Sequence, residues 1–426
     1  MKFIYWLPLV VIIILLLFVP PLAFFASVSG LAVVGIYGKK EEHLSLFFVL
    51  LFGAFVSTAI SATSHPLFLY EESDFTTYYL NYLVFYNEGL DANIEEYFKF
   101  GSPIELGLPI LHFLFALVID APYPYLVKFF HAAVQLILLL AVVMKIAKYY
   151  SLSFKELSLI YSLTLLFYKF GATLNHLVQG YSSFFILFAV FSNRKVNIWL
   201  LFATLFHLSA LLIYPLVRFL ILTKSKSKLL LFCLVCLATS VVIYLMLSII
   251  SNFISSSGSY LTKLQWAFTK VMEPAKVADS IKLALVASMY LVPLLLINAI
   301  AFFQRRVTLP LCYNILAIFV FVVSFSYLPG ISVRVMAPVL TILVGFVYFK
   351  SLYTRIKLTQ FPLVLYFFIV FFPLNWLIRS ELYYYSYPMA SHYPMYYVNT
   401  FFISKEGVTR NMLPSQEDII IDNPHK

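Results

Sequence analysis

Charged residues are scarce in this sequence. Only 11% of its 426 residues are Asp, Glu, Lys or Arg, whereas 62% are hydrophobic and 19% are aromatic. A chain of this length cannot bury so much apolar surface in one soluble core, so lipid must be the solvent for most of it. The composition therefore argues against an ordinary soluble protein and predicts an integral membrane protein built from transmembrane helices.

Cysteine is also rare, with three residues in the whole chain. Three thiols do not build a disulfide framework. Cys233 and Cys236 lie in an apolar stretch, where we expect them to act as small hydrophobic side chains. The sequence also lacks a His-x-Glu pair and a cluster of carboxylates on one short segment. We therefore expect neither a metal ion nor a cofactor.

The net charge of +10 does not indicate a nucleic-acid partner. The basic residues occupy short connections at the ends of apolar stretches and form no single basic face. This distribution is typical of cytoplasmic loops in membrane proteins. We therefore place the following residues on the cytoplasmic side: Lys39, Lys40, Lys145, Lys148, Lys155, Arg194, Lys195, Lys224, Lys226, Lys228, Arg305, Arg306, Lys350, Arg355 and Lys357.

Apolar stretches of roughly 20 residues, the length that crosses a bilayer as a helix, predict about ten to twelve spans. The first stretch, 3–38, is interrupted by Pro20 and Pro21, which predicts either one kinked span or a tight hairpin. The later candidates are 44–61, 123–144, 157–170, 174–191, 198–222, 229–250, 283–303, 309–327, 335–349 and 362–377. We expect an all-α polytopic bundle that forms one membrane domain, residues 1–378. An aromatic and then polar tail, residues 379–426, is expected on the outer side.

Acidic residues gather between residues 63 and 122, where Lys99 is the only lysine or arginine. This stretch is therefore predicted to be a large extracytoplasmic loop. Within it, residues 104–119 are apolar, but a crossing there would place the connection at 145–155 outside. We expect a juxtamembrane helix in the outer leaflet instead. In the same way, a single crossing at 198–222 would place the basic connection at 224–228 outside. We therefore expect a half-membrane hairpin there that bends near 207–209.

This topology brings scattered polar residues to the outer membrane face. Ionisable groups at membrane depth cost about 2.5–3.5 kcal/mol each on insertion scales, so each requires a partner or a function. We interpret the group as a pocket. Its expected members are Asp74, Glu105, Asn175, His176, Gln179, His207 and Arg334, with Lys128, His131 and Lys169 near the same level.

Each main candidate also has a plain structural interpretation. Asp74 belongs either to a solvated acidic loop or to a helix that shares one face with Tyr78, four residues later. Glu105 stabilises the N-terminus of the next helix, acts as a general base or a sugar-binding carboxylate, or does both. His207 is either a hydrogen-bonded core residue or a catalytic one. Arg334 either extends to lipid headgroups or clamps a phosphate through its guanidinium.

Several of these motifs, in their order and spacing, resemble the EpsG-like polysaccharide polymerases, relatives of the Wzy-type O-antigen polymerases. The resemblance extends from about residue 44 to residue 349. It rests on Asp74-x-x-x-Tyr78, Glu105-x-Gly107, the stretch 175–182, the segment Leu205-Phe-His207-x-Ser209-Ala-Leu and Arg334. The histidine segment is its most specific part.

This sequence departs from the family pattern at two places. The family usually has an Arg-Gln pair where this chain has Val178-Gln179, and Glu-Pro-Gly where it has Glu105-Leu-Gly107. The missing arginine puts one phosphate contact in doubt. Lys169 and His176 are the candidates to replace it.

The resemblance implies a GT-C-like bundle in a bacterial inner membrane, with its site facing the periplasm or the cell exterior. Such enzymes transfer a growing glycan from one undecaprenyl diphosphate carrier onto the repeat unit of another. In this chain, Arg334, helped by His207 and Lys128, would hold the diphosphate. Asp74 or Glu105 would take the acceptor proton, and the other would bind sugar hydroxyls. The expected substrate-binding residues are Tyr78, Lys128, Asn175, His176, Gln179 and Ser209.

The expected partners are the lipid-linked oligosaccharide, membrane lipid and a chain-length regulator protein. Two other functions stay open. An O-antigen ligase or another polyprenyl-linked glycosyltransferase would use the same carboxylate and arginine elements. A flippase for the lipid-linked unit is a different class, which typically has two repeated halves with matching broken helices. The sequence has no such repeat and its acidic loop is asymmetric, which favours an enzyme.

Overall fold

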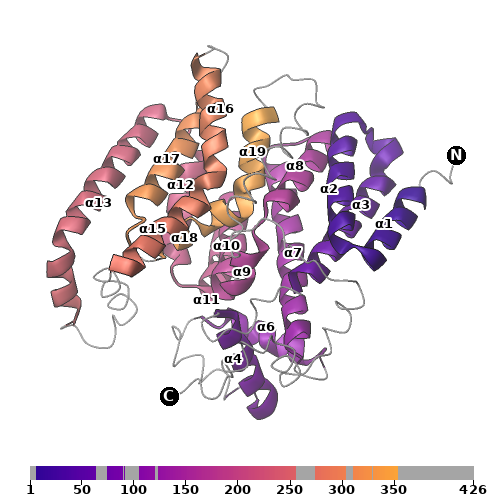
Figure 1. Ribbon diagram of the computed structural model, residues 1–426, viewed down its shortest axis with the longest axis horizontal. Coiled ribbons are helices and arrows are strands. Elements are labelled where there is room, and N and C mark those ends of the chain that lie inside the picture. Colours follow the sequence, from indigo (N-terminus) through magenta and orange to yellow (C-terminus); the bar gives the residue numbers. More distant parts are fainter. Residues whose placement is uncertain are drawn as a thin grey trace.

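The computed structural model describes residues 6–63, 74–89, 91, 105–119, 123–255, 274–303, 310–328 and 330–353. Every regular element in this part of the chain is a helix (Figure 1), which confirms the predicted all-α class. Five helices are long and apolar enough to cross a membrane, and further apolar helices are shorter. The five are Pro20–Tyr37, Glu42–Ile60, Pro124–Tyr149, Lys226–Met246 and Val277–Leu296. The expected span at 362–377 and the tail at 379–426 lie outside the described residues.

The N-terminal apolar stretch is a tight hairpin and not one kinked span. Its helices are α1 (Trp6–Phe18) and α2 (Pro20–Tyr37), and the next helix is α3 (Lys40–Thr63). The prolines stand at the start of α2, where a residue without an N–H is tolerated. A Cβ added at Gly53 of α3 would lie 2.6 Å from Ile12 and 2.7 Å from Ser27. These two residues belong to α1 and α2, so both helices pass α3 at the same level.

The longest central helix is α7 (Pro124–Tyr149), and beside it the chain folds back through α8 (Phe154–Phe167), α9 (Phe170–Asn175) and α10 (Leu177–Val190). The turn lies part-way along α7, because Gln135 Nε2 donates a 2.9 Å hydrogen bond to the Thr173 carbonyl. At the far end, the rings of Tyr150 and Phe191 are 6.2 Å apart. With 14 residues each, α8 and α10 are about 21 Å long, shorter than the two full spans predicted at 157–170 and 174–191.

The next two helices are α11 (Val196–Phe206) and α12 (Ala210–Leu222), separated by a break at 207–209. Trp199 stacks on Phe188 and Phe206 stacks on Tyr181, so α11 runs antiparallel to α10. At the end of α12, the Leu220 carbonyl accepts a hydrogen bond from Asn314. Just after α12, Lys224 interacts with Lys350, whose ammonium bonds to Tyr150 beside Phe191. The chain thus returns to the end at which α11 begins, and it bends at the break, where the sequence predicts a bend.

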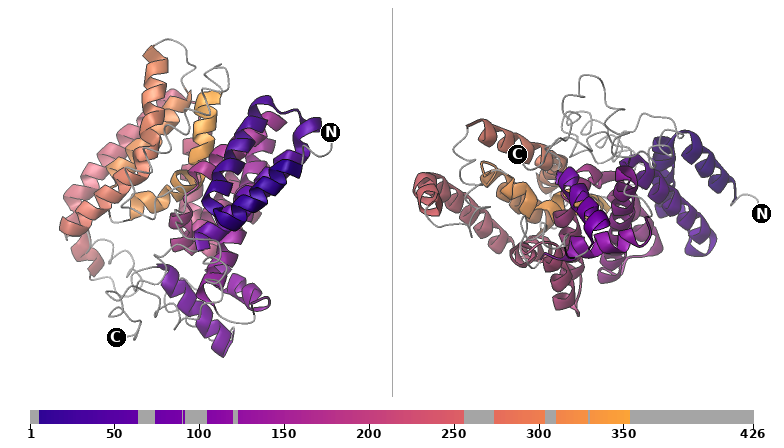
Figure 2. Two further views of the ribbon diagram at one scale, coloured as in Figure 1. Left: turned by 45° about the vertical axis from the view of Figure 1, so that its right-hand side comes forward. Right: turned by 90° about the horizontal axis from the view of Figure 1, so that it is seen from below.

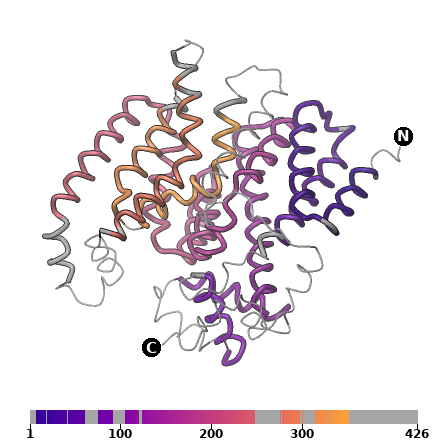
Figure 3. Tube along the Cα trace, in the orientation of Figure 1, coloured from indigo at the N-terminus to yellow at the C-terminus, as the bar shows by residue number. Residues whose placement is uncertain are grey.

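The remaining helices complete the bundle. They are α13 (Lys226–Ser255), α15 (Pro274–Ser288), η3 (Met289–Leu291), α16 (Val292–Phe303), α17 (Pro310–Ser324), α18 (Ile331–Val335), the π-helical turn η4 (Pro338–Leu343) and α19 (Val344–Tyr353). Lys226 lies over the Tyr313 ring and Ser240 donates to the Ser324 carbonyl, so α13 and α17 run parallel. The path of the chain through these helices can be followed in Figure 3.

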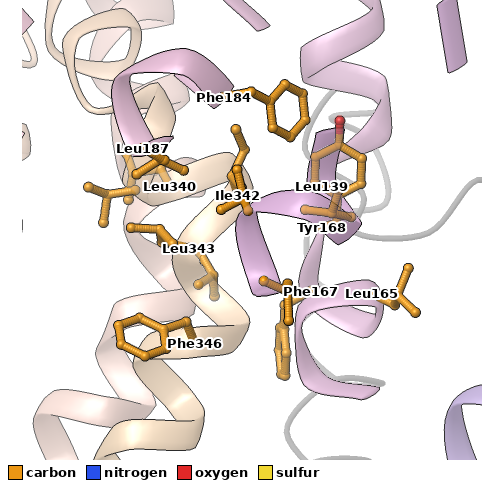
Figure 4. Close-up of a cluster of buried hydrophobic side chains, with 14 of the residues drawn as sticks. Leu139, Leu165, Phe167, Tyr168, Phe184, Leu187, Leu340, Ile342, Leu343 and Phe346 are labelled. Carbon is orange, nitrogen blue, oxygen red and sulfur yellow. The ribbon is translucent and has the colours of Figure 1, made fainter. Parts of the chain in front are cut away.

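The buried core extends through most of the helices, and its central part lies where α7, α8, α10 and η4–α19 meet. Figure 4 shows its side chains, among them Leu139, Phe167, Tyr168, Phe184, Leu187, Ile342, Leu343 and Phe346. Phe167 stacks on Tyr348 with ring centroids 4.5 Å apart. The Lys169 amide donates a 3.1 Å hydrogen bond to the Thr341 carbonyl, which joins the break after α8 to the π-helical turn. Close packing at this point fixes the level at which the short helices end.

Most of the basic connections lie together at one end of the bundle. Lys155 Nζ donates a 3.3 Å hydrogen bond to the Ile36 carbonyl, and Lys350 Nζ donates a 2.9 Å hydrogen bond to the Tyr150 hydroxyl. Lys224 lies near enough to Lys350 for their charges to interact. We call this the basic end. The connection at 304–309 lies outside the described residues.

The predicted acidic loop contains two helices, α4 (Asp74–Glu88) and α6 (Gly107–Ala116). They form a small lobe with the N-terminal part of α7, at the end of the bundle opposite the basic end (Figures 1 and 2). With 10 residues, α6 is about 15 Å long and too short to cross a bilayer, as the sequence predicts.

Candidate functional site

Two of the expected site residues, far apart in the sequence, are in direct contact. Glu105 stands just before α6, and His207 follows the last residue of α11 in an extended conformation with φ −155°. The distance between His207 Nδ1 and Glu105 Oε1 is 2.8 Å. The same carboxylate oxygen accepts a 3.0 Å hydrogen bond from the Leu208 amide. The two residues are called the Glu105–His207 pair below.

Both side chains of the pair are largely enclosed, and Glu105 is more deeply buried than His207. The Glu105 side chain is 7% exposed and the His207 side chain 29%. A buried carboxylate is costly unless it is hydrogen-bonded, and the imidazole and the Leu208 amide provide that compensation. The Leu208 amide that Glu105 binds lies two residues before α12, whereas the plain structural interpretation places this carboxylate at the N-terminus of the helix that follows it, α6.

Glycine at position 107 allows this contact. A Cβ there would lie 2.7–2.8 Å from three atoms of the Phe206 ring, so only Gly lets the two segments approach so closely. On its other side Phe206 stacks on Tyr181 of α10, with ring centroids 4.9 Å apart. The motifs Glu105-x-Gly107 and Phe206-His207 are therefore packed against each other and against α10.

Arg334 lies on a different side of α10. It is exposed in the last turn of α18, and its side chain passes beside Gly330, which has φ +69°. The side-chain nitrogen of Gln179 donates a hydrogen bond to the Arg334 carbonyl. Successive residues of a helix are separated by about 100°, so Gln179 and Tyr181 point to nearly opposite sides of α10. The Arg334 backbone and the pair therefore contact different faces of the first turns of α10.

This contact also changes the interpretation of Gln179. Gln179 is 7% exposed, and its amide nitrogen is engaged with the Arg334 backbone. The geometry favours a role for Gln179 in holding α18 against α10 over the expected contact with substrate. Asn175 and His176 are half-buried at the break between α9 and α10, and Ser209 is half-buried just before α12.

The residues expected from α4 are placed near α7. Asp74 and Tyr78 both belong to α4, four residues apart, as the sequence predicts, although the Asp74 side chain is outside the described part. Phe75 is buried, and Lys128 Nζ of α7 lies 5.8 Å from the centre of its ring. Lys128 is itself 6% exposed. This lysine is therefore enclosed between α7 and α4.

Lys169 is in a position unlike the expected one. Its side chain is fully buried, and Nζ lies 3.0 Å from the centre of the Tyr290 ring. Its burial argues against Lys169 as the replacement for the missing arginine, and His176 stays as the candidate.

A buried seam of polar rings lies beside the pair. His112 of α6 is 5.5 Å from both Tyr82 of α4 and His131 of α7, measured between ring centroids. The His131 Nδ1 atom is 2.9 Å from the Tyr181 hydroxyl. Burial, and then the nearby Tyr86, raise the pKa of Tyr82 to about 12, and burial lowers the pKa of His112 to about 3. Both rings are therefore uncharged at neutral pH.

Sequence reasoning placed only His131 of this seam near the site. The available signal for His112 was a histidine inside an apolar stretch, which is common in protein cores. Among the described residues, no three His, Cys, Asp or Glu side chains lie together in a way that could hold a metal ion.

Comparisons with known proteins do not add to this geometry: no family model matches the chain, and no curated protein or solved structure is found to be similar to it.

Proposed function

We propose that the chain is a membrane glycosyltransferase that polymerises undecaprenyl-diphosphate-linked oligosaccharide repeat units into O-antigen or a similar surface polysaccharide. It would act in a bacterial inner membrane as a GT-C-like bundle, with α4 and α6 at the outer face. The observation that carries the proposal is the Glu105–His207 contact. Two motifs that resemble the EpsG-like polymerases are 102 residues apart in sequence and meet in space.

The location of the pair supports the proposal. It lies between the bundle and the lobe of α4 and α6, at the end opposite the basic end. If the basic end is cytoplasmic, as its charge indicates, the pair faces outward. A lipid-linked donor approaches from the bilayer while its sugars project into water, so a site at this interface fits both parts of the substrate.

The chemistry of the residues also fits glycosyl transfer. The leaving group is a diphosphate, which departs readily, so the enzyme needs cationic stabilisation and a base for the acceptor hydroxyl. Arg334 would supply the first, because it is exposed and its guanidinium can bind phosphate in a bidentate manner. The Glu105–His207 pair would supply the second.

The proposal is tested by the glycan ladder on a gel. Cells that lack the protein are complemented with the wild type, with Glu105→Gln or His207→Asn, or with the matched controls Glu88→Gln and His43→Asn, at equal membrane levels. Glu88 is exposed in α4, and His43 lies at the basic end beside Lys39. We expect the deletion strain to show a core carrying a single repeat unit, and only the wild type and the controls to restore the ladder.

Two other results would change the assignment. If no repeat unit reaches the surface of the deletion strain, a flippase or a ligase becomes the better explanation. If the ladder persists without the protein, the chain does not polymerise this glycan.

A further inference from the structure

We infer that His207, through Nε2, takes the proton of the acceptor hydroxyl, and that Glu105 is a positioning residue that fixes the tautomer and the direction of the imidazole. This inference rests on the proposed glycosyl transfer. It changes the division of roles within that reaction, because the sequence suggests a carboxylate as the base and a diphosphate contact for His207.

The Glu105 carboxylate is poorly placed to be the base. Its Oε1 atom already accepts hydrogen bonds from His207 Nδ1 and from the Leu208 amide, at 2.8 Å and 3.0 Å. Its side chain is 7% exposed, against 29% for His207. A hydroxyl group that approaches from the surroundings would meet the imidazole first.

The tautomer follows from the chemistry of the contact. An ionised carboxylate only accepts hydrogen bonds, so His207 Nδ1 must carry the proton in the 2.8 Å contact. The neutral ring then has its lone pair on Nε2. Among the described residues, no hydrogen-bond partner of Nε2 is found. When Nε2 gains a proton, the Nδ1–H group of the imidazolium keeps its hydrogen bond to the carboxylate.

The backbone holds the ring in this direction. The extended conformation of His207 ends α11, and its carbonyl accepts a 3.0 Å hydrogen bond from the Ala210 amide. Phe206 is confined between Gly107 and Tyr181. Glu105 therefore bonds to both the side chain of His207 and the backbone of the next residue. Such preorganisation lowers the entropy cost of reaching the reactive geometry.

The reaction balances with this assignment. The acceptor oxygen forms a bond to the anomeric carbon of the donor glycan while its proton passes to His207 Nε2. The bond from that carbon to the diphosphate oxygen breaks, and the electron pair leaves with the lipid diphosphate. The imidazolium then returns its proton to the diphosphate or to water, so Glu105 remains a carboxylate throughout.

The pH dependence of the initial rate tests the roles. The full chain is placed in lipid vesicles with lipid-linked repeat units, and kcat and KM are measured across pH. In the wild type the rate should fall at acidic pH as the imidazole becomes protonated. His207→Gln should lower kcat by about 10²–10⁴-fold and remove this acidic limb. Glu105→Gln should lower kcat with little change in KM and keep the decrease of the rate at acidic pH, because the base, His207, is still present.

The controls Glu88→Gln and His43→Gln should keep the wild-type profile. The assignment is overturned if Glu105→Gln removes the acidic limb while His207→Gln retains it, because Glu105 is then the base. It is also overturned if His207→Gln raises the KM for the donor and leaves kcat unchanged, which would indicate a diphosphate contact.

A second measurement does not depend on turnover. Nitrogen NMR of histidine-labelled protein, with the His207 signal assigned by its loss in His207→Gln, should show a proton on Nδ1 in the wild type and a mixture of tautomers in Glu105→Gln. A proton on Nε2 in the wild type would contradict the inference. If the vesicles show no polymerisation by the wild type, the proposed function fails, and the tautomer still decides the role of Glu105.

Discussion

At the scale of the residue, the geometry of the site depends on the missing side chain of Gly107. The Phe206 ring occupies the space where a side chain at position 107 would stand, and it directly precedes His207. Small displacements there are transmitted to the imidazole through one peptide unit. The packing of an apolar ring therefore decides the geometry of a hydrogen bond between two polar groups.

We expect Gly107→Ala to impair the reaction without removing any polar group. The added methyl would lie 2.7–2.8 Å from the Phe206 ring, so the ring must move, at a cost of about 1–3 kcal/mol in stability. The shift should lengthen the contact between Glu105 and His207 and lower kcat. Thermal unfolding in detergent and initial rates measure the two effects.

The compensating variant Gly107→Ala with Phe206→Leu provides the control, because the smaller side chain restores the space. The double variant should recover part of the stability and activity, which shows coupling between the two positions. Additive losses would mean that the two side chains do not compete for this space.

At the scale of the element, helix breaks were predictable from sequence only where their cause is local or is forced by charge. Pro20 and Pro21 indicate the break between α1 and α2. The bend at 207–209 follows from the need to keep Arg194 and Lys224 on the same side. The sequence also separates the stretches 157–170 and 174–191, but it does not show that α8 and α10 are too short for two full spans. Between them the helix ends because of tertiary contacts, in which the Tyr168 hydroxyl bonds to Gln135 and Thr173.

The site was predictable to a similar degree. The residue types and their motifs indicated Glu105 and His207 as members, but their contact depends on how α6 packs on α11, which no local pattern encodes. For Lys169 the sequence was misleading. A charged residue in an apolar stretch suggested a contact with the ligand, but the structure places the Lys169 side chain on the Tyr290 ring. Tertiary packing decides which polar residues stay accessible.

We expect the connections before α11 and after α12 to lie on the same side of the membrane. Asn193→Cys and Ser227→Cys introduce thiols at exposed positions near the basic end. In a background with the three native cysteines replaced, a membrane-impermeant thiol reagent should label both from the same side. Labelling of the two thiols from opposite sides would show that α11 and α12 together cross the membrane once.

At the scale of the whole molecule, charge and shape are arranged along one axis. The connections that carry Lys39, Lys155, Lys224 and Lys350 converge at one end of the bundle. The lobe of α4 and α6 stands at the other (Figure 2). Between these ends, helices such as α13 expose many large apolar side chains, for example Leu234, Leu245 and Val241, as lipid-facing surfaces do.

This arrangement predicts a definite orientation. Positively charged connections are retained on the cytoplasmic side, so the basic end should face inward and the lobe outward. We test this in intact cells with the cysteine-replaced background and three exposed positions, Glu42→Cys and Lys148→Cys at the basic end and Asn87→Cys in the lobe. The impermeant reagent should label Asn87→Cys directly and the other two only after the membrane is permeabilised. If the two groups label in the reverse order, the Glu105–His207 pair faces the cytoplasm, and polymerisation at the outer face is no longer tenable.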